Sequence, residues 1–185
     1  MNIPVSLHIR PLTVADAPLL ARVSLQAYRD HYLHLWHDRG AWYTQKCFTV
    51  EQLATELADA SSRFFLIYAA EKPVGFLKLN LSEPAQSHVK AGYVPPADAL
   101  ELERIYFVRA ATGQGIGSAV LRFVDDFARQ NGKRTVWLKA MDSSTDALQF
   151  YRKNGYRPVG THRLDFSQMK EEYWGMVILG KALPE

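Results

Sequence analysis

Apolar residues recur along the first third of the chain at spacings that predict a strand followed by helices. Apolar and polar residues alternate over 6–12, which predicts a short strand ended by a proline. Thr13 or Asp16 can cap the helix that follows. Its apolar positions recur every three or four residues, at Ala17, Leu20, Val23 and Ala27. The helix should therefore end near Tyr28.

A second group of elements lies between residues 49 and 108. Thr49 and Gln52 have the spacing of a capping box, which predicts a helix through about residue 58. Two apolar runs, 64–70 and 74–81, are separated by three residues and predict an antiparallel hairpin. The stretch 83–98 has three prolines and no clear period, so we expect a surface loop.

The last third of the chain alternates strands and helices. A strand from about residue 100 to 108 leads through glycines into a helix whose apolar positions are Ile116, Val120, Val124 and Phe127. Gly132 suits the left-handed position after that helix. Residues 135–139 predict a strand, 144–153 a helix, and two final strands begin at Tyr156 and Tyr173. This order predicts an α/β (α+β) protein.

Three glycines alternate at the junction of the central strand and helix, at positions 113, 115 and 117. The first N–H groups of a helix have no intrahelical partner, and the helix dipole favours negative charge there. The turn therefore predicts an anion-binding site, suited to a phosphate or pyrophosphate. It lacks the lysine of a P-loop, and its third glycine comes one residue too early for the dinucleotide pattern. A purely structural glycine turn remains the alternative at this point.

The segment 29–47 is unusually aromatic and also carries charged side chains. One reading is a helix or loop that covers the core. The other is a wall that receives an amine or another small polar ligand. For the second reading the candidate substrate-binding residues are Tyr28, Tyr32 and Trp36.

Composition narrows the class of protein. The chain has 185 residues, 48% of them hydrophobic, which fits one domain, 1–185, with a sizeable core. A formal charge of +3 with dispersed basic residues argues against nucleic acid. Neither a signal peptide nor a membrane span is apparent, so we expect a cytoplasmic protein. The single cysteine, Cys47, reads as a small core residue rather than a nucleophile.

A second motif follows the glycine turn by about thirty residues. It reads Ser144-x-x-Ala147-x-x-Phe150-Tyr151-x-Lys153-x-Gly155-Tyr156. With the turn from Thr112 to Gly117, it resembles the GNAT superfamily of N-acetyltransferases, and within it the bacterial spermidine/spermine N-acetyltransferase-like branch. The resemblance implies a single-domain acyltransferase fold, with a mixed, mostly antiparallel, twisted sheet of about six to seven strands flanked by helices.

The resemblance also implies acetyl-CoA as cofactor. The turn would hold its pyrophosphate, and backbone amides of Tyr106 to Val108 would pair with the pantetheine arm. The implied cofactor contacts are Ile105, Tyr106, Phe107, Val108, Thr112, Gly113, Gln114, Gly115, Ile116, Gly117, Ser118, Ser144, Ala147, Tyr151 and Lys153. Thr112 stands where the family has Gln or Arg, and Ser144 where it has Asn. Arg109 is a candidate to replace the missing charge.

Acetyl transfer to an amine needs a base for the amine and a proton for the departing thiolate. The resemblance assigns the proton donor role to Tyr151. Glu103 is the candidate general base because it lies on the strand that enters the turn, and Glu101 points to the same face and is a candidate substrate contact. The histidines at 31, 34, 37, 88 and 162 are too scattered for a metal site, so we expect no metal.

The sequence therefore predicts an acetyl-CoA-dependent N-acetyltransferase that acetylates a primary amine of a small molecule, with a polyamine among the acceptors, by direct attack in a ternary complex. Two alternatives stay open. One is a protein or peptide N-acetyltransferase, and the other is a non-catalytic acyl-CoA-binding sensor. A monomer or a homodimer is compatible with the sequence.

Overall fold

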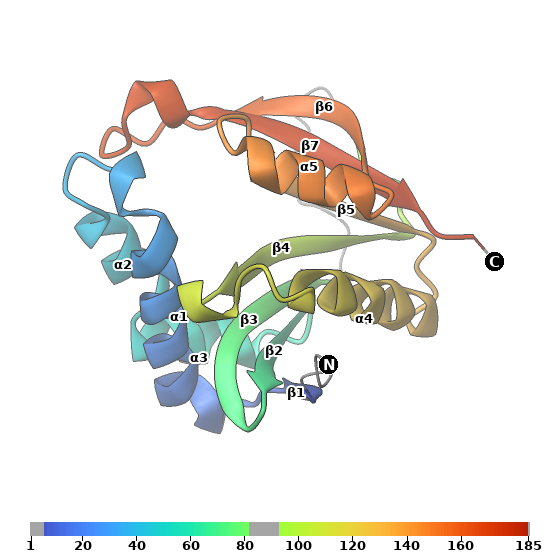
Figure 1. Ribbon diagram of the computed structural model, residues 1–185, viewed down its shortest axis with the longest axis horizontal. Helices are drawn as coiled ribbons and strands as arrows, with labels where there is room; N and C mark the ends of the chain where they lie inside the picture. Colours follow the sequence, from blue (N-terminus) through green and yellow to red (C-terminus); the bar gives the residue numbers. More distant parts are fainter. Residues whose placement is uncertain (1–5, 82–92, 185) are drawn as a thin grey trace. The chain divides into compact units, whose positions relative to one another are not determined.

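A computed structural model of the chain describes residues 6–81 and 93–184, and its elements follow the predicted order (Figure 1). The strands are β1 (Leu7–Pro11), β2 (Ser62–Ala69), β3 (Lys72–Asn80), β4 (Ala99–Phe107), β5 (Thr135–Met141), β6 (Arg157–Arg163) and β7 (Gly175–Ala182). The α-helices are α1 (Ala17–His31), α2 (Ala41–Cys47), α3 (Val50–Ala58), α4 (Ile116–Gln130) and α5 (Thr145–Lys153). Short 3₁₀ helices include η1 (Val14–Asp16), η2 (Leu33–Leu35), η4 (Arg109–Ala111) and η5 (Glu171–Tyr173).

The strands form one mixed sheet in the order β1-β2-β3-β4-β5-β7-β6. Within the sheet, β1 and β2 pair antiparallel, as do β5 and β7 and also β6 and β7, whereas β4 and β5 pair parallel. A seven-stranded, mostly antiparallel sheet with flanking helices confirms the predicted fold class. By the density of its internal contacts the chain forms two compact units, and β4 contributes residues to both.

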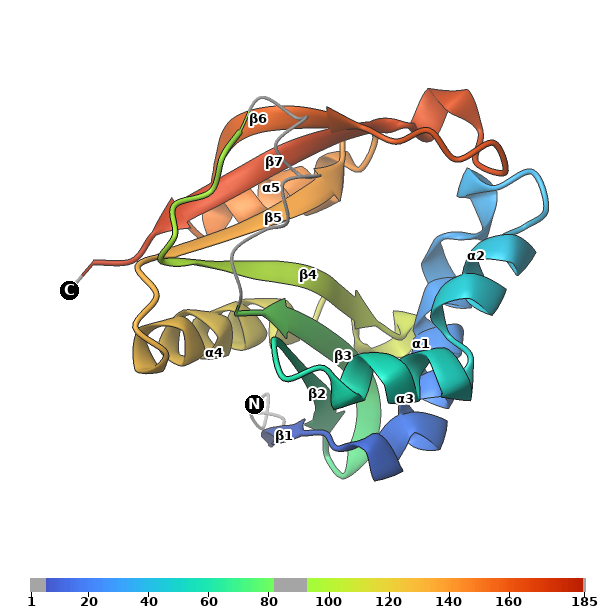
Figure 2. The same cartoon turned by 180° about the vertical axis from the view of Figure 1, so that it is seen from behind.

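The first unit comprises Met1–Leu79 and Arg104–Val120. Its helices α1, α2 and α3 group together, with α3 against α1 and β2 (Figures 1 and 2). The apolar face predicted for α1 is confirmed, because its four apolar positions are all buried: Ala17, Leu20, Val23 and Ala27. Thr49 caps α3 by accepting a hydrogen bond from the Gln52 N–H at 3.2 Å. The Gln52 side chain does not complete a capping box but donates to Glu56.

The β2–β3 connection is tighter than the sequence predicts. The prediction places three residues between the strands, but Lys72 and Pro73 belong to β3, and Ala70 and Glu71 make the turn. Both turn residues have positive φ, 46° and 66°, as the two central positions of a type I′ hairpin turn require. The connection therefore accepts two side chains in a conformation that glycine and asparagine usually occupy.

The second unit comprises Asn80–Glu103 and Leu121–Glu185. Strands β5, β7 and β6 run side by side, and α5 lies along them (Figure 2). Helix α4 buries Leu121, Val124 and Ala128, whereas Phe127 is only half-buried, so its apolar face is slightly rotated from the predicted one. The helix ends as predicted at Gly132, with φ 70° and a bond from the Lys133 N–H to the Ala128 carbonyl.

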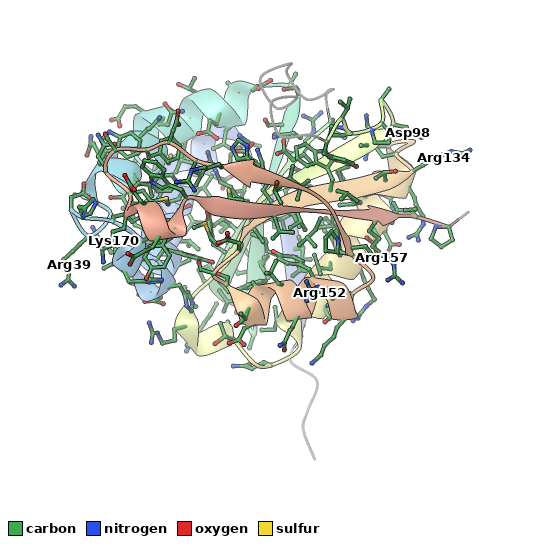
Figure 3. The ribbon with its side chains drawn as sticks, turned by 90° about the horizontal axis from the view of Figure 1, so that it is seen from above. Arg39, Asp98, Arg134, Arg152, Arg157 and Lys170 are labelled. Atoms are coloured by element: carbon green, nitrogen blue, oxygen red, sulfur yellow. The ribbon has the colours of Figure 1, made fainter. Side chains whose placement is uncertain are left out.

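The segment that precedes β4 is only partly described. Residues 83–92 of the predicted loop lie outside the described residues. Residues 93–98 are irregular up to the start of β4, and the Arg134 N–H donates to the Asp98 carbonyl at 2.9 Å, which joins the starts of β4 and β5 (Figure 3). Tyr93 packs on a small core of Ala99, Trp137 and Ile178.

Candidate active site

The glycine turn between β4 and α4 has the backbone shape that the anion-binding prediction requires. Gly113 and Gly115 have φ of 76° and 75°, a region that side chains with a Cβ rarely adopt. A Cβ built on either glycine meets nothing within 4 Å, so the backbone of the turn is open on that side. The residues from Thr112 to Gly115 are exposed. The turn can therefore approach a ligand closely.

Hydrogen bonds within the turn orient its side chains away from the helix amides. The Thr112 hydroxyl donates to the Arg109 carbonyl at 2.8 Å, and the Gln114 amide donates to the Ala110 carbonyl at 2.7 Å. The first-turn N–H groups of α4, at Ile116, Gly117 and Ser118, have no acceptor within the helix because of helix geometry. These donors and the helix dipole fit the pyrophosphate of acetyl-CoA.

The start of the turn is fixed to the end of α1. The Arg109 N–H donates to Asp30 Oδ2 at 2.8 Å, and the Arg109 guanidinium contacts the Asp30 carbonyl. The Gln26 amide donates to the other Asp30 carboxylate oxygen at 2.8 Å. Arg109, the candidate for the charge that Thr112 lacks, is therefore directed to α1 in this structure.

Only some of the backbone amides of β4 that were predicted to pair with the pantetheine arm point away from β3. The Val108 N–H donates to the Val74 carbonyl of β3 at 2.9 Å, which contradicts its predicted pairing with the cofactor. A Cβ on Gly75 would lie 2.4 Å from the Tyr106 carbonyl, so that group also faces β3. Because N–H groups alternate sides along a strand, Ile105 and Phe107 carry the amides that point the other way.

The β4–β5 ladder is short. It contains three residue pairs, from Ala99↔Thr135 to Glu101↔Trp137, although β4 continues to Phe107. Beyond Glu101 this ladder gives the backbone of β4 no partner in β5. An extended amide-bearing arm can pair with such a strand as another strand would.

Helix α5 carries the second group of predicted residues. Tyr151 is buried and packs edge-on against Tyr156, with ring centroids 5.7 Å apart. Ser144 precedes the helix, but its hydroxyl does not cap α5. Ala147 is half-buried and Lys153 is exposed at the C-terminal end, the end where Arg152 and Arg157 are labelled in Figure 3. The turn belongs to the first unit and these residues belong to the second.

The two predicted carboxylates do share one face of β4. Glu101 and Glu103 both accept a hydrogen bond from the side-chain nitrogen of Asn80, at 2.9 Å and 2.6 Å. Glu101 is 7% exposed, and Glu103 and Asn80 are half-buried. Asn80 is the last residue of β3, and its role could not be read from the sequence because it depends on which strand lies beside β4.

The aromatic segment folds into one cluster around Tyr106. The Tyr106 ring lies 5.2 Å from Tyr32 and 5.4 Å from Phe76, centroid to centroid. Tyr43 belongs to the same cluster, since its ring stacks on Tyr28 with centroids 4.9 Å apart. The sequence assigned only the backbone of Tyr106 to the site, so its side chain was missed. A strand residue surrounded by aromatic residues from four other segments has no local sequence signal.

Tyr28 and Trp36 occupy the core of this cluster. They are 3% and 2% exposed, and the Trp36 indole N–H donates to the Tyr28 hydroxyl at 2.8 Å. Both polar groups are thus satisfied inside the protein, which fits the reading of this segment as a cover for the core. Tyr32 is half-buried. Of the three aromatic residues predicted as substrate contacts, Tyr32 keeps the exposure that a ligand contact needs.

Burial sets the protonation of this cluster. It raises the pKa of Tyr28, Tyr32, Tyr43 and Tyr106 above the ordinary value for a phenol. Burial also raises the pKa of Cys47, which makes it a poor nucleophile. The cluster is therefore neutral and apolar at physiological pH.

Nearby in the first unit, a carboxylate binds two cations. Glu56 Oε2 lies 2.9 Å from Lys78 Nζ and 3.0 Å from the Arg104 guanidinium, and all three side chains are largely buried. Within residues 6–81 and 93–184, no group of three histidine, cysteine, aspartate or glutamate residues could hold a metal ion. Over the same part of the chain, no helix is long and apolar enough to cross a membrane.

Comparison with known proteins gives three kinds of similarity. The model of the acetyltransferase (GNAT) family matches residues 25–156, more than half of the chain. An uncharacterized N-acetyltransferase in the pepI 3′ region of Lactobacillus delbrueckii subsp. lactis is 25% identical over 151 residues, which cover 80% of this chain and 82% of the relative. Streptothricin acetyltransferase of Streptomyces lavendulae is 29% identical over 99 residues, 53% of this chain and 46% of the relative.

Solved structures share the fold. The PaiA N-acetyltransferase from Thermoplasma acidophilum, in complex with coenzyme A, superimposes with a TM-score of 0.72. It is 20% identical in sequence, and the superposition covers 96% of this chain and 99% of that one.

Proposed function

From the premise that the chain belongs to the acetyltransferase (GNAT) family, we propose that it transfers an acetyl group from acetyl-CoA to a primary amine of a small molecule. Family membership makes the protein an acetyl-CoA-dependent N-acetyltransferase. The class of acceptor and the roles of individual residues are the proposal. Bound acetyl-CoA supplies the acetyl group as a thioester.

The turn from Thr112 to Ser118 binds the pyrophosphate through the first amides of α4. Gly113 and Gly115 allow the close approach, since neither has a side chain and both hold positive φ. Ile105 and Phe107 offer amides to the pantetheine arm. The Ser144 hydroxyl, which does not cap α5, can add a short contact to the cofactor. Lys153, exposed and cationic, is suited to a phosphate group of the cofactor.

Glu103 accepts the proton of the attacking amine, directly or through one water. Tyr151 donates a proton to the departing thiolate, a step for which a phenol is suitable because its ordinary pKa is about 10. Neither step forms a covalent bond between protein and substrate. Both residues therefore act on protons, with the amine attacking in a ternary complex.

The observation that carries the choice of acceptor is the pair of carboxylates held on one face of β4. Glu101 and Glu103 meet at Asn80, and Glu101 is buried. Negative charge in a partly buried position attracts a protonated amine. The relative named streptothricin acetyltransferase supports a small-molecule acceptor. Polyamines, which carry several protonated amines, are the first acceptors to test.

A thiol-release assay tests this proposal. Purified protein is incubated with acetyl-CoA and polyamines, aminoglycosides, streptothricin, amino acids or short peptides, and CoA release is followed. Release with small amines above the rate with peptides supports the proposal. Faster release with peptides would assign a protein or peptide acceptor. Tight acetyl-CoA binding by calorimetry without release for any acceptor would indicate a sensor.

Replacing Tyr151 by Phe tests the acid role. The change removes one hydroxyl from a buried ring, and we expect kcat to fall about a hundredfold while the Kd for acetyl-CoA changes less than about threefold. Calorimetry and steady-state kinetics measure the two quantities. Tyr173→Phe on η5 is the matched control. Equal kcat for Tyr151→Phe and the parent would remove Tyr151 as proton donor.

A further inference from the structure

Asn80 connects the two carboxylates through a single nitrogen. Its Nδ2 donates to Glu101 Oε2 at 2.9 Å and to Glu103 Oε2 at 2.6 Å. The three residues come from the end of β3 and the first half of β4, and all lie within the second unit. An asparagine 21 and 23 positions away in sequence thus meets both acids.

The chemistry of the three groups fixes the orientation of the amide. Ionised carboxylates only accept hydrogen bonds, so the NH₂ end of Asn80 must face them, and its oxygen must point away. An NH₂ group has two hydrogens, and each carboxylate takes one. Bonds in which the acceptor is charged are stronger than neutral ones.

Two carboxylates that reach the same nitrogen are close enough to repel one another. In the absence of the donor between them, their side chains would move apart into other rotamers, or one would bind a proton. Either outcome removes a base from its position on β4. The donor between them offsets this repulsion and helps to hold both side chains on the same face of β4.

We propose that Asn80 is a positioning residue that holds Glu103 ionised and oriented for proton abstraction from the acceptor amine. The inference rests on the proposed function, because it gives Asn80 a role in that reaction. Asn80 does not itself exchange protons. It acts through Glu103, by reducing the repulsion between the carboxylates of Glu103 and Glu101.

Other charges on the same strands also affect the protonation of Glu103. The charged residues nearest to it along β3 and β4 are Glu101, Arg104 and Lys78, and Lys139 lies on β5, the strand beside β4. Lys78 and Arg104 both contact Glu56, which offsets part of their charge. The variants below leave the three cations and Glu56 in place. Differences between variants therefore report on Asn80 and Glu101.

The test compares variants that should shift the protonation of Glu103 in opposite directions. Asn80→Leu keeps the size of the side chain and removes the donor, so Glu103 gains a proton more easily. Glu101→Gln removes the neighbouring negative charge, so Glu103 loses its proton more easily. Asn80→Ser keeps one donor and covers the case in which the leucine variant does not fold. Asn131→Leu, whose amide donates to the Phe127 carbonyl, is the matched control.

We expect the acidic limb of the kcat/KM profile to move up by about one pH unit in Asn80→Leu and down in Glu101→Gln. At neutral pH, kcat should fall about tenfold or more in Asn80→Leu, less in Asn80→Ser, and not at all in Asn131→Leu. The KM for acetyl-CoA should stay constant in all four. An unmoved acidic limb in folded Asn80→Leu, or shifts of the same sign in Asn80→Leu and Glu101→Gln, would overturn the inference.

A second readout separates this inference from the proposed function. Carboxyl titration by NMR, on protein labelled with ¹³C-glutamate, follows Glu103 without any turnover. Opposite shifts of this titration in the two variants support the arrangement described here. If the parent releases no CoA with any acceptor while the titrations still move apart, the proposed function has failed and Asn80 is left without a catalytic role.

Discussion

At the scale of single residues, β3 passes very close to the end of β4 at Gly75. Gly75 has no side chain, and a Cβ there would lie 2.4 Å from the Tyr106 carbonyl and 2.8 Å from the Phe107 ring. Glycine is thus required by space at this position. At Gly132 the requirement is different, because its φ is 70° and a Cβ would meet nothing within 4 Å.

Alanine substitutions should separate these two requirements. Gly75→Ala forces backbone and ring to move, and we expect a loss of about 2–3 kcal/mol in the free energy of unfolding. Gly132→Ala strains only the backbone and should cost about 1 kcal/mol. Urea denaturation measures both values. A smaller loss for Gly75→Ala than for Gly132→Ala would contradict the close approach of β3 and β4.

A second residue-scale prediction concerns Glu56. Glu56→Gln removes the negative charge between Lys78 and Arg104, whose side chains are 10% and 11% exposed. Two cations are then left with little solvent, so we expect about 3 kcal/mol of destabilisation. The control is Asp126→Asn, which breaks the exposed pair with Arg129 and should cost less than about 1 kcal/mol. Similar losses in denaturant titrations of both variants would argue against a desolvated ion cluster.

At the scale of elements, regular periodicity made most of the fold predictable. The α1 face, the Thr49 cap and the Gly132 helix end all depend on residues within a few positions of each other, so local spacing was sufficient. The turn glycines could be recognised for the same reason. What depends on strand neighbours was not predictable, including the Asn80 bridge and the β3-facing N–H of Val108. For the segment 29–47 the sequence predicted a helix or loop, but the bounds of the seven-residue helix α2 could not be read because its closely spaced aromatic residues give no clear period.

The entry to α1 gives a pH-dependent prediction. The Thr13 N–H donates to the Asp16 carboxylate at 2.9 Å, and this bond, with help from Arg10, lowers the pKa of Asp16 below 3.8. A carboxyl whose pKa is lower in the folded state stabilises it above the unfolded pKa and loses that effect as the pH falls through the folded pKa. Melting temperatures of Asp16→Asn and the parent should therefore differ at pH 7 and converge below about pH 4. A constant difference would exclude this linkage.

The aromatic cluster predicts a loss of stability at alkaline pH. Burial raises the pKa of Tyr28, Tyr43 and Tyr106, so these phenols stay protonated in the folded state while the unfolded chain ionises above about pH 10. The unfolded state then binds fewer protons, and stability falls as the pH rises past that value. Absorbance at alkaline pH should show these tyrosines ionising together with unfolding. Reversible ionisation of all tyrosines in folded protein would contradict the burial.

At the scale of the whole molecule, ligand binding is the property that tests the glycine turn. A ligand that binds only the folded state stabilises it by about 2.7 kcal/mol at a hundred times its Kd. Acetyl-CoA should therefore raise the melting temperature of the parent. Gly115→Val places a branched side chain at φ 75° in the turn, and we expect at least a tenfold weaker Kd by calorimetry and a smaller thermal shift. An unchanged Kd for acetyl-CoA in Gly115→Val would show that the pyrophosphate does not bind at this turn.

The number of residues in β4 is as constrained as their identity. The strand carries Glu101 and Glu103 in one unit and Tyr106 in the other. Because side chains alternate faces, one residue inserted between Glu103 and Arg104 would turn every later side chain over and remove Tyr106 from its aromatic neighbours. The Val108–Val74 bond would shift as well. A surface loop tolerates an insertion of one residue, but the same insertion in β4 should prevent folding, whatever residue is inserted.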